Sequence, residues 1–163
     1  MYEPDGSVPG AEFQKPPFPN QPAPPPPGKG MIKVVSIIMI VFGSIGLFVS
    51  FLAILLTLML DSLFRGLDFS ILFFFLFFGM AVMACMFVFG IIGIINAGKA
   101  AKAQTIINMG IILCALIAID TITPAIVIGN VFVLFMIITL PIGLVLAILY
   151  IEGGNMNKKS LKS

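Results

Sequence analysis

The sequence contains no histidine and no tryptophan, and only 10% of its 163 residues are charged. The lack of histidine removes the side chain that enzymes use most often as a general base and as a metal ligand. The two cysteines, Cys85 and Cys114, each lie inside an apolar run and not in a CxxC or Cys/His spacing, which argues against a zinc site or a disulfide framework. We therefore expect no cofactor, no metal and no enzymatic activity, because none of the usual nucleophile–base arrangements can be assembled.

The small share of charge is matched by a large share of apolar residues. Hydrophobic residues make up 60% of the chain and the mean hydropathy is +1.16, whereas soluble domains are about 25% charged. About 20 apolar residues suffice to cross the ~30 Å hydrocarbon layer as a helix. The sequence therefore predicts an integral membrane protein surrounded by the lipid bilayer, and no nucleic-acid partner, because no soluble domain carries a basic stripe. The uncharged runs cover residues 34–60, 69–98, 103–119 and 121–151.

The composition divides the chain into three parts. Residues 1–30 contain ten of the twelve prolines and are expected to form a disordered tail. Residues 31–152 are expected to form an all-α membrane domain, an antiparallel bundle of four transmembrane helices, and residues 153–163 a short basic tail. The predicted spans cover about 31–60, 69–97, 99–119 and 124–151.

The proline-rich tail favours an extended polyproline II conformation between residues 16 and 27. The segments PPFP and PNQP match the PxxP pattern that aromatic-lined grooves recognise. Pro16, Pro19 and Pro22 are therefore candidate partner-binding residues. The alternative is a spacer that binds nothing.

Two boundaries depend on charge and proline. Residues 103–119 are short for a span, so we expect the third helix to begin at Lys99, with its lysines extending toward the headgroups. The segment DTITP predicts a turn at Asp120, with Thr123 as the N-cap and Pro124 at the first position of the fourth helix. Asp120 would then lie at a membrane boundary, as would the three other acidic residues of this domain, and no ionisable side chain would lie well inside a span.

Small residues recur at helical spacing in every span. In membranes such rows let neighbouring helices approach closely, since lipid provides no hydrophobic drive for their association. We expect the rows on the third and fourth spans to face each other. The candidate packing residues are Gly43, Gly46 and Ser50, then Gly90 and Gly93, then Gly110, Cys114 and Ala118, and finally Thr139, Gly143 and Ala147.

The basic residues are distributed unevenly. With four spans, all eight lysines lie on the side of the two termini and the 97–104 link, and the opposite side carries only Arg65. Because lysine and arginine are retained on the inner side of a membrane, both termini are expected to be cytoplasmic. The lysines nearest the spans are expected to anchor to lipid headgroups: Lys29, Lys33, Lys99, Lys102, Lys158 and Lys159.

The segment PAPPPPGKG followed by a span, together with the link INAGKAAKAQ, resembles small bacterial four-span membrane proteins of uncharacterised function. In outline the chain is also similar to the CD20-like and MARVEL-type proteins of animals. The first resemblance implies a multi-pass protein of a bacterial cell membrane, and it carries over no functional residue.

Two functions are compatible with this sequence. The first is a non-enzymatic interaction or scaffold protein whose tail binds a protein partner. The alternative is a small transporter, channel or transporter accessory subunit with a polar path formed by Asn96, Asn108, Asn130 and the Pro141 kink. Assembly as a homo-oligomer is left open.

Overall fold

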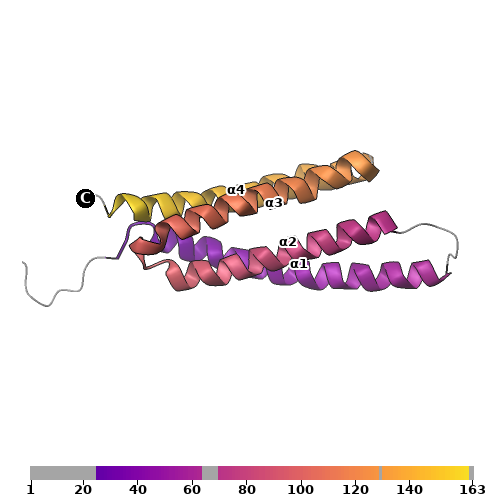
Figure 1. Ribbon diagram of the computed structural model, residues 1–163, viewed down its shortest axis with the longest axis horizontal. Coiled ribbons are helices and arrows are strands. Elements are labelled where there is room, and N and C mark those ends of the chain that lie inside the picture. Colours follow the sequence, from indigo (N-terminus) through magenta and orange to yellow (C-terminus); the bar gives the residue numbers. More distant parts are fainter. Residues whose placement is uncertain (1–24, 64–69, 129, 162–163) are drawn as a thin grey trace, which may run out of the picture.

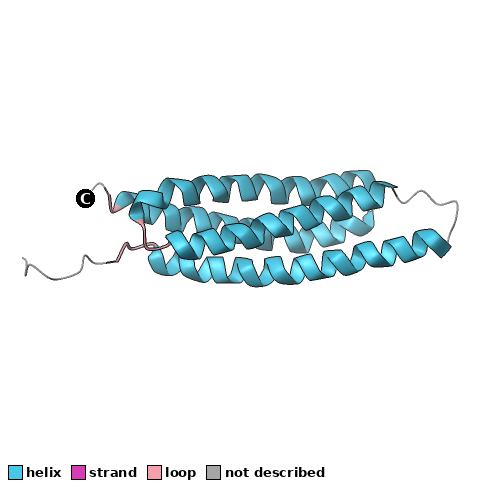
Figure 2. Ribbon diagram, turned by 60° about the horizontal axis from the view of Figure 1, so that its bottom comes forward, coloured by secondary structure: helices cyan, strands magenta, loops and turns pink. Residues whose placement is uncertain are grey.

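The computed structural model describes residues 25–63, 70–128 and 130–161, with side chains except at 125, 127–128 and 130–139. Pro16, Pro19 and Pro22 lie outside these ranges, as does Arg65. Nearly all of the described chain is helical (Figures 1 and 2).

The described residues form four long α-helices and one short 3₁₀ helix. Helix α1 covers Lys29–Leu63 and α2 covers Ser70–Asn96. The 3₁₀ helix η1 covers Ala100–Lys102, α3 covers Ala103–Ile128, and α4 covers Asn130–Lys159. Each α-helix exceeds the length that the hydrocarbon layer requires, and all four are apolar enough to cross a membrane. This composition suggests a membrane protein.

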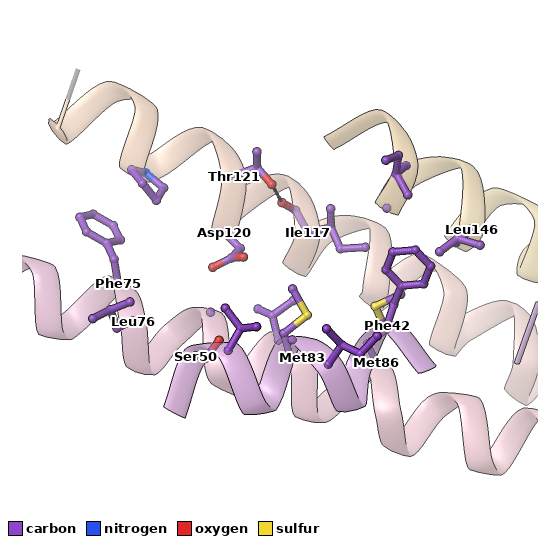
Figure 3. Close-up of a pocket in the computed structure, with 18 of the residues that line it drawn as sticks. Phe42, Ser50, Phe75, Leu76, Met83, Met86, Ile117, Asp120, Thr121 and Leu146 are labelled. Carbon is purple, nitrogen blue, oxygen red and sulfur yellow. Dashed lines mark hydrogen bonds between the residues drawn. The ribbon is translucent and has the colours of Figure 1, made fainter. Parts of the chain in front are cut away.

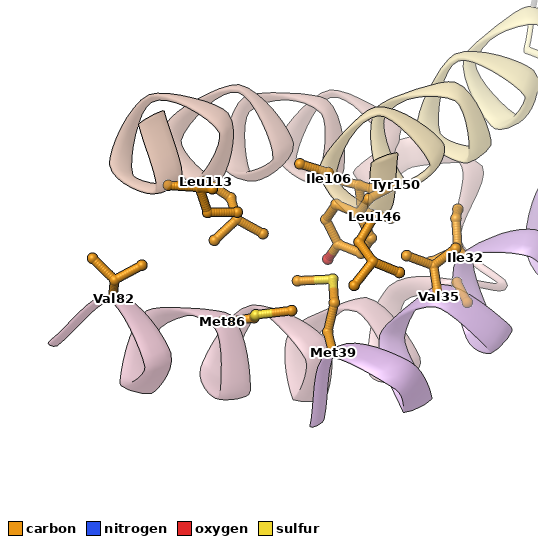
Figure 4. Packing of buried hydrophobic residues seen from close by; sticks show 12 residues of the cluster. Ile32, Val35, Met39, Val82, Met86, Ile106, Leu113, Leu146 and Tyr150 are labelled. Atoms are coloured by element: carbon orange, nitrogen blue, oxygen red, sulfur yellow. The ribbon is translucent and has the colours of Figure 1, made fainter. Parts of the chain in front are cut away.

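The helices lie in two pairs, α1 beside α2 and α3 beside α4 (Figure 1). A core of buried apolar side chains joins the pairs in the half of the molecule that contains the start of α1 and the end of α4 (Figure 4). Toward the other end α2 and α3 diverge in Figure 1. Labelled members of this core are Ile32, Val35, Met39, Val82, Met86, Ile106, Leu113, Leu146 and Tyr150.

The outer surface of the helices is apolar. On α1, for example, Phe48 is 63% exposed, and on α2 Phe74 is 64% exposed. A water-soluble monomer rarely exposes such continuous apolar surface. Facing lipid tails, these side chains carry no hydration cost, which fits helices long enough to span a bilayer.

The boundary between α3 and α4 differs from the sequence prediction. Asp120, Thr123 and Pro124 lie inside α3, and α4 begins at Asn130. Proline inside a membrane helix removes one backbone hydrogen bond, and neighbouring helices can make this tolerable. As a consequence, Asp120 lies about two helical turns before the end of α3, and not in a turn between two helices.

The start of the third helix and the end of α4 also differ from the sequence prediction. Lys99 is extended, with φ −110° and ψ 96°, and the third helix begins after it, first as η1 and then as α3. Helix α4 continues to Lys159, so the segment expected to be a basic tail is packed against the bundle over most of its described length. Gly153, Gly154 and Asn157 are buried there.

Candidate functional site

Two regions of the bundle carry polar or charged groups in positions that could serve a function. The first is the lysine-bearing end, defined here as the start of α1, the 97–102 link and the end of α4. The second is a cavity between the two helix pairs, farther from the lysines.

The six lysines predicted to anchor to headgroups all belong to the lysine-bearing end. Lys29 is half-buried, and the aliphatic part of its side chain lies beside Gly98. Lys158 Nζ donates a hydrogen bond of 2.8 Å to Gln104 Oε1 and thereby connects α4 to α3. The exposed lysines are Lys33, Lys99, Lys102, Lys158 and Lys159.

Asn157 connects three segments of this end. Its side chain is fully buried, and Oδ1 accepts a 2.9 Å hydrogen bond from the backbone N–H of Gly28. Its Nδ2 donates a 3.0 Å bond to the carbonyl oxygen of Ala97. A single amide therefore joins the chain just before α1, the end of α2 and the end of α4.

Glycines allow the start of α1 and the end of α4 to approach each other closely. A Cβ on Gly28 would collide with the carbonyl oxygen of Gly153, and a Cβ on Gly153 would lie 2.7 Å from Ile32 Cγ1. One helical turn before Gly153, the Tyr150 hydroxyl donates a 3.0 Å bond to the carbonyl oxygen of Phe89. This end is therefore closely packed and polar contacts cross between its helices.

The cavity has a volume of about 470 Å³ and is lined by residues of all four α-helices (Figure 3). Its walls are mostly apolar or aromatic. This volume lies within the ~300–1,000 Å³ that small-molecule sites occupy. Lining side chains labelled in Figure 3 include Phe42, Phe75, Leu76, Met83, Met86 and Leu146.

Asp120 of α3 places a carboxylate in this apolar cavity. It lies against Gly79 of α2, where a Cβ would come within 3.3 Å of Oδ1. The Thr121 hydroxyl also lines the cavity, but it donates a 2.7 Å bond to the Ile117 carbonyl oxygen in its own helix. Among the described residues, neither a cation nor a hydrogen-bond donor is bonded to the Asp120 carboxylate.

Most of the predicted packing residues of α1 and α2 lie where these two helices contact each other. A Cβ on Gly43 would lie 2.9 Å from the Phe87 backbone nitrogen, and one on Gly46 would lie 2.5 Å from Met83 Sδ. A Cβ on Gly90 would lie 2.8 Å from the Ser36 carbonyl oxygen. On α2, Gly93 lies against the side chains of Ser36 and Tyr150, and on α1 Ser50 lines the cavity.

The predicted packing residues of α3 and α4 are brought together in part. Gly110 lies against Ile151 and the carbonyl oxygen of Ala147, and a Cβ on Gly143 would lie 3.0 Å from Ile117 Cγ2. Cys114 and Ala118 are half-buried on α3. The Thr139 side chain lies outside the described residues.

The polar path considered for a transporter is not assembled by the described residues. Asn96 donates a 3.0 Å bond to the Ile92 carbonyl oxygen in its own helix, and Asn108 is exposed and accepts a bond from Gln104. Neither lines the cavity. The Asn130 side chain lies outside the described residues, and Pro141 is exposed on α4.

Sequence reasoning missed Asn157 and Asp120. Tyr150, Gly153, Gly154 and Asn157 follow the i, i+3, i+4, i+7 spacing of a single helix face, which could have indicated that α4 continues as a packed helix. For Asp120 the misleading signal was the proline that follows it. No group of three or more potential metal ligands occurs among the described residues.

Comparisons with protein-family models, with curated proteins and with solved structures gave no match to this chain.

Proposed function

We propose that the protein is a non-enzymatic integral membrane protein with four antiparallel spans and with both termini in the cytoplasm. Four sufficiently long apolar helices and their exposed apolar surface support the insertion. The gathering of lysines at one end supports the orientation, because the basic side of a membrane protein stays inside. On the resemblance stated above, we place it in a bacterial cell membrane.

Its function in this proposal is to hold the proline-rich tail at the cytoplasmic face, where the tail binds a protein partner. The observation that carries this proposal is the hydrogen bond between Asn157 and Gly28. It fixes the chain to α4 at the point where the proline run ends. A tail attached at a fixed point presents its extended segment at a defined place beside the lysines. A tail without this attachment would not be held at a defined place.

The test removes the tail without disturbing this attachment. Residues 25–28 contribute to the packed end, so the truncated chain should begin with a methionine before Pro25. Proteins crosslinked to the full chain and to the truncated chain in membranes are identified by mass spectrometry. We expect partners of the full chain to be lost from the truncated chain, and also from a full-length variant with Pro16, Pro19 and Pro22 replaced by alanine. An unchanged set of partners, with both variants inserted normally, would contradict the proposal.

The cavity favours a second candidate, a small transporter, channel or transporter accessory subunit. A carboxylate inside a membrane helix is costly and is by default a functional-site hypothesis. The Asp120 carboxylate faces the open space of the cavity between the helix pairs, and it is not paired with another group of the described core.

A further inference from the structure

We propose that the cavity between the two helix pairs binds a lipophilic organic cation, with the Asp120 carboxylate as its counter-ion. This proposal rests on the second candidate function and specifies its ligand class. It does not depend on the tail.

The charge in the cavity favours a cationic ligand. Asp120 faces a cavity with mostly apolar walls, and among the described residues no lysine or arginine is paired with it. A carboxylate moved out of water is strongly disfavoured unless a positive group compensates it. Pro124, one turn later in α3, also lacks the N–H that would donate to the Asp120 backbone carbonyl, so this position is rich in acceptors. A monovalent cation supplies the missing compensation.

The walls of the cavity favour an organic cation. Phe42 and Phe75 lie toward the two sides of the cavity in Figure 3, with Asp120 between them. Aromatic faces attract cations, and the effect is stronger where water is excluded. Met83 and Met86 add polarisable, flexible side chains that adapt to ligands of irregular shape. These walls fit an organic cation with apolar substituents.

A hydrated metal ion does not fit this cavity. Hard cations require several oxygen ligands, and divalent sites use carboxylates together with carbonyls and waters. Of the described lining residues only Asp120 has a carboxylate, and no cluster of three potential ligands occurs in the described part of the chain. A drug-sized organic cation instead fits a volume of about 470 Å³.

The alternative occupant is a neutral lipid chain, which the apolar walls would also accept. A lipid chain gains nothing from the carboxylate and would leave it uncompensated. The two occupants are therefore distinguished by the charge of the ligand and by the charge at position 120.

The experiment measures binding of tetraphenylphosphonium to the purified full chain in nanodiscs of zwitterionic phosphatidylcholine, with empty nanodiscs as the blank. Tetraphenylborate has nearly the same shape with the opposite charge, and tetraphenylmethane is the neutral analogue. We expect saturable binding of the phosphonium, no saturable binding of tetraphenylborate measured on its own, and no competition from tetraphenylmethane. Asp120→Asn keeps the shape and removes the charge, and it should weaken binding at least tenfold.

Two further variants sharpen the result. Asp61→Asn removes an exposed acid at the end of α1, outside the cavity, and should leave binding unchanged. Gly79→Leu places a side chain against the Asp120 carboxylate and should weaken binding at least tenfold. The melting temperature of each variant shows that it is folded. The truncated chain that begins at Pro25 should bind like the full chain, so failure of the tail proposal leaves this result unaffected.

Three outcomes would overturn the proposal. One is unchanged phosphonium binding by folded Asp120→Asn. Another is effective competition by tetraphenylmethane, which would identify an apolar site for lipid chains. The third is an absence of phosphonium binding by the native chain. If the Arg65→Gln variant then bound the phosphonium, Asp120 would already be paired with Arg65 in the native protein, which also overturns the proposal.

Discussion

The lysine-bearing end and the cavity are built from the same four helices, yet they differ in how the helices meet. At the lysine-bearing end, Asn157 bonds to two other segments and Gly28 meets Gly153 backbone to backbone. Around the cavity, mostly apolar side chains of the two helix pairs face each other across an open space, and Asp120 places a carboxylate in it. The first region is organised for close contact and the second for an open space.

The difference shows how an apolar bundle can hold together in lipid. Burial of leucine or phenylalanine against another helix gains little there, because lipid tails are equally apolar. Close packing at glycines and hydrogen bonds between helices remain as the specific forces. They are concentrated in the half that contains Gly90, Gly93, Tyr150 and Asn157. Stability therefore depends mainly on that half, and the other half is free to carry a cavity.

The largest effect is expected at Asn157. Asn157→Ala leaves the Gly28 N–H and the Ala97 carbonyl without their partner in a buried position. Each unsatisfied buried group costs about 1–3 kcal/mol, so for the two groups together the loss in the free energy of unfolding should be about 2–6 kcal/mol. Unfolding of the purified protein in mixed micelles, followed by circular dichroism, measures it.

Asn155→Ala is the matched control for this variant. Asn155 lies half a turn earlier in α4 and has no hydrogen bond among the described residues. We expect a change below about 0.5 kcal/mol. Equal effects of the two alanine variants would show that Asn157 does not hold the three segments together.

A smaller effect compares two glycines of one helix. At Gly90 an added Cβ would lie 2.8 Å from the backbone oxygen of Ser36, which cannot yield locally, so Gly90→Ala should destabilise by about 1–3 kcal/mol. At Gly79 the neighbour is the Asp120 carboxylate at 3.3 Å, beside the cavity. Gly79→Ala should be neutral, or stabilising by up to about 1 kcal/mol, through helix propensity.

The same unfolding assay measures both alanine variants. If Gly79→Ala destabilised as much as Gly90→Ala, the cavity half would be as closely packed as the lysine-bearing end, and the contrast between them would be lost.

Much of the fold could be predicted from the apolar runs, because a chain with four uncharged runs of this length favours four long apolar helices. Four apolar helices are confirmed. The start of α4 could not be placed, since Thr123-Pro124 has the pattern of a helix start, and within a membrane helix proline carries less information than it does in water. Helix α4 instead begins at Asn130.

The candidate site was less predictable for the same reason. In a turn between helices the Asp120 carboxylate would be an ordinary polar group, and only the continuation of α3 brings it opposite Gly79. Asn157 was assigned to a tail because Glu152 and three lysines follow the last apolar run. Its importance comes from contacts with Gly28 and Ala97, which are distant in sequence and can be recognised only after the helices are packed.

The central claim is that the helix pairs are tied together at the lysine-bearing end and held less tightly around the cavity. Two spin-label pairs between α2 and α3 test it by double electron–electron resonance in nanodiscs, with Cys85 and Cys114 replaced by alanine. The labels are placed at exposed positions, Ile95 with Thr105 near the lysines and Ile71 with Ile126 at the other end. The account predicts a single narrow distance distribution for the first pair and a clearly broader one for the second. Equally narrow distributions, or a broader one near the lysines, would contradict it.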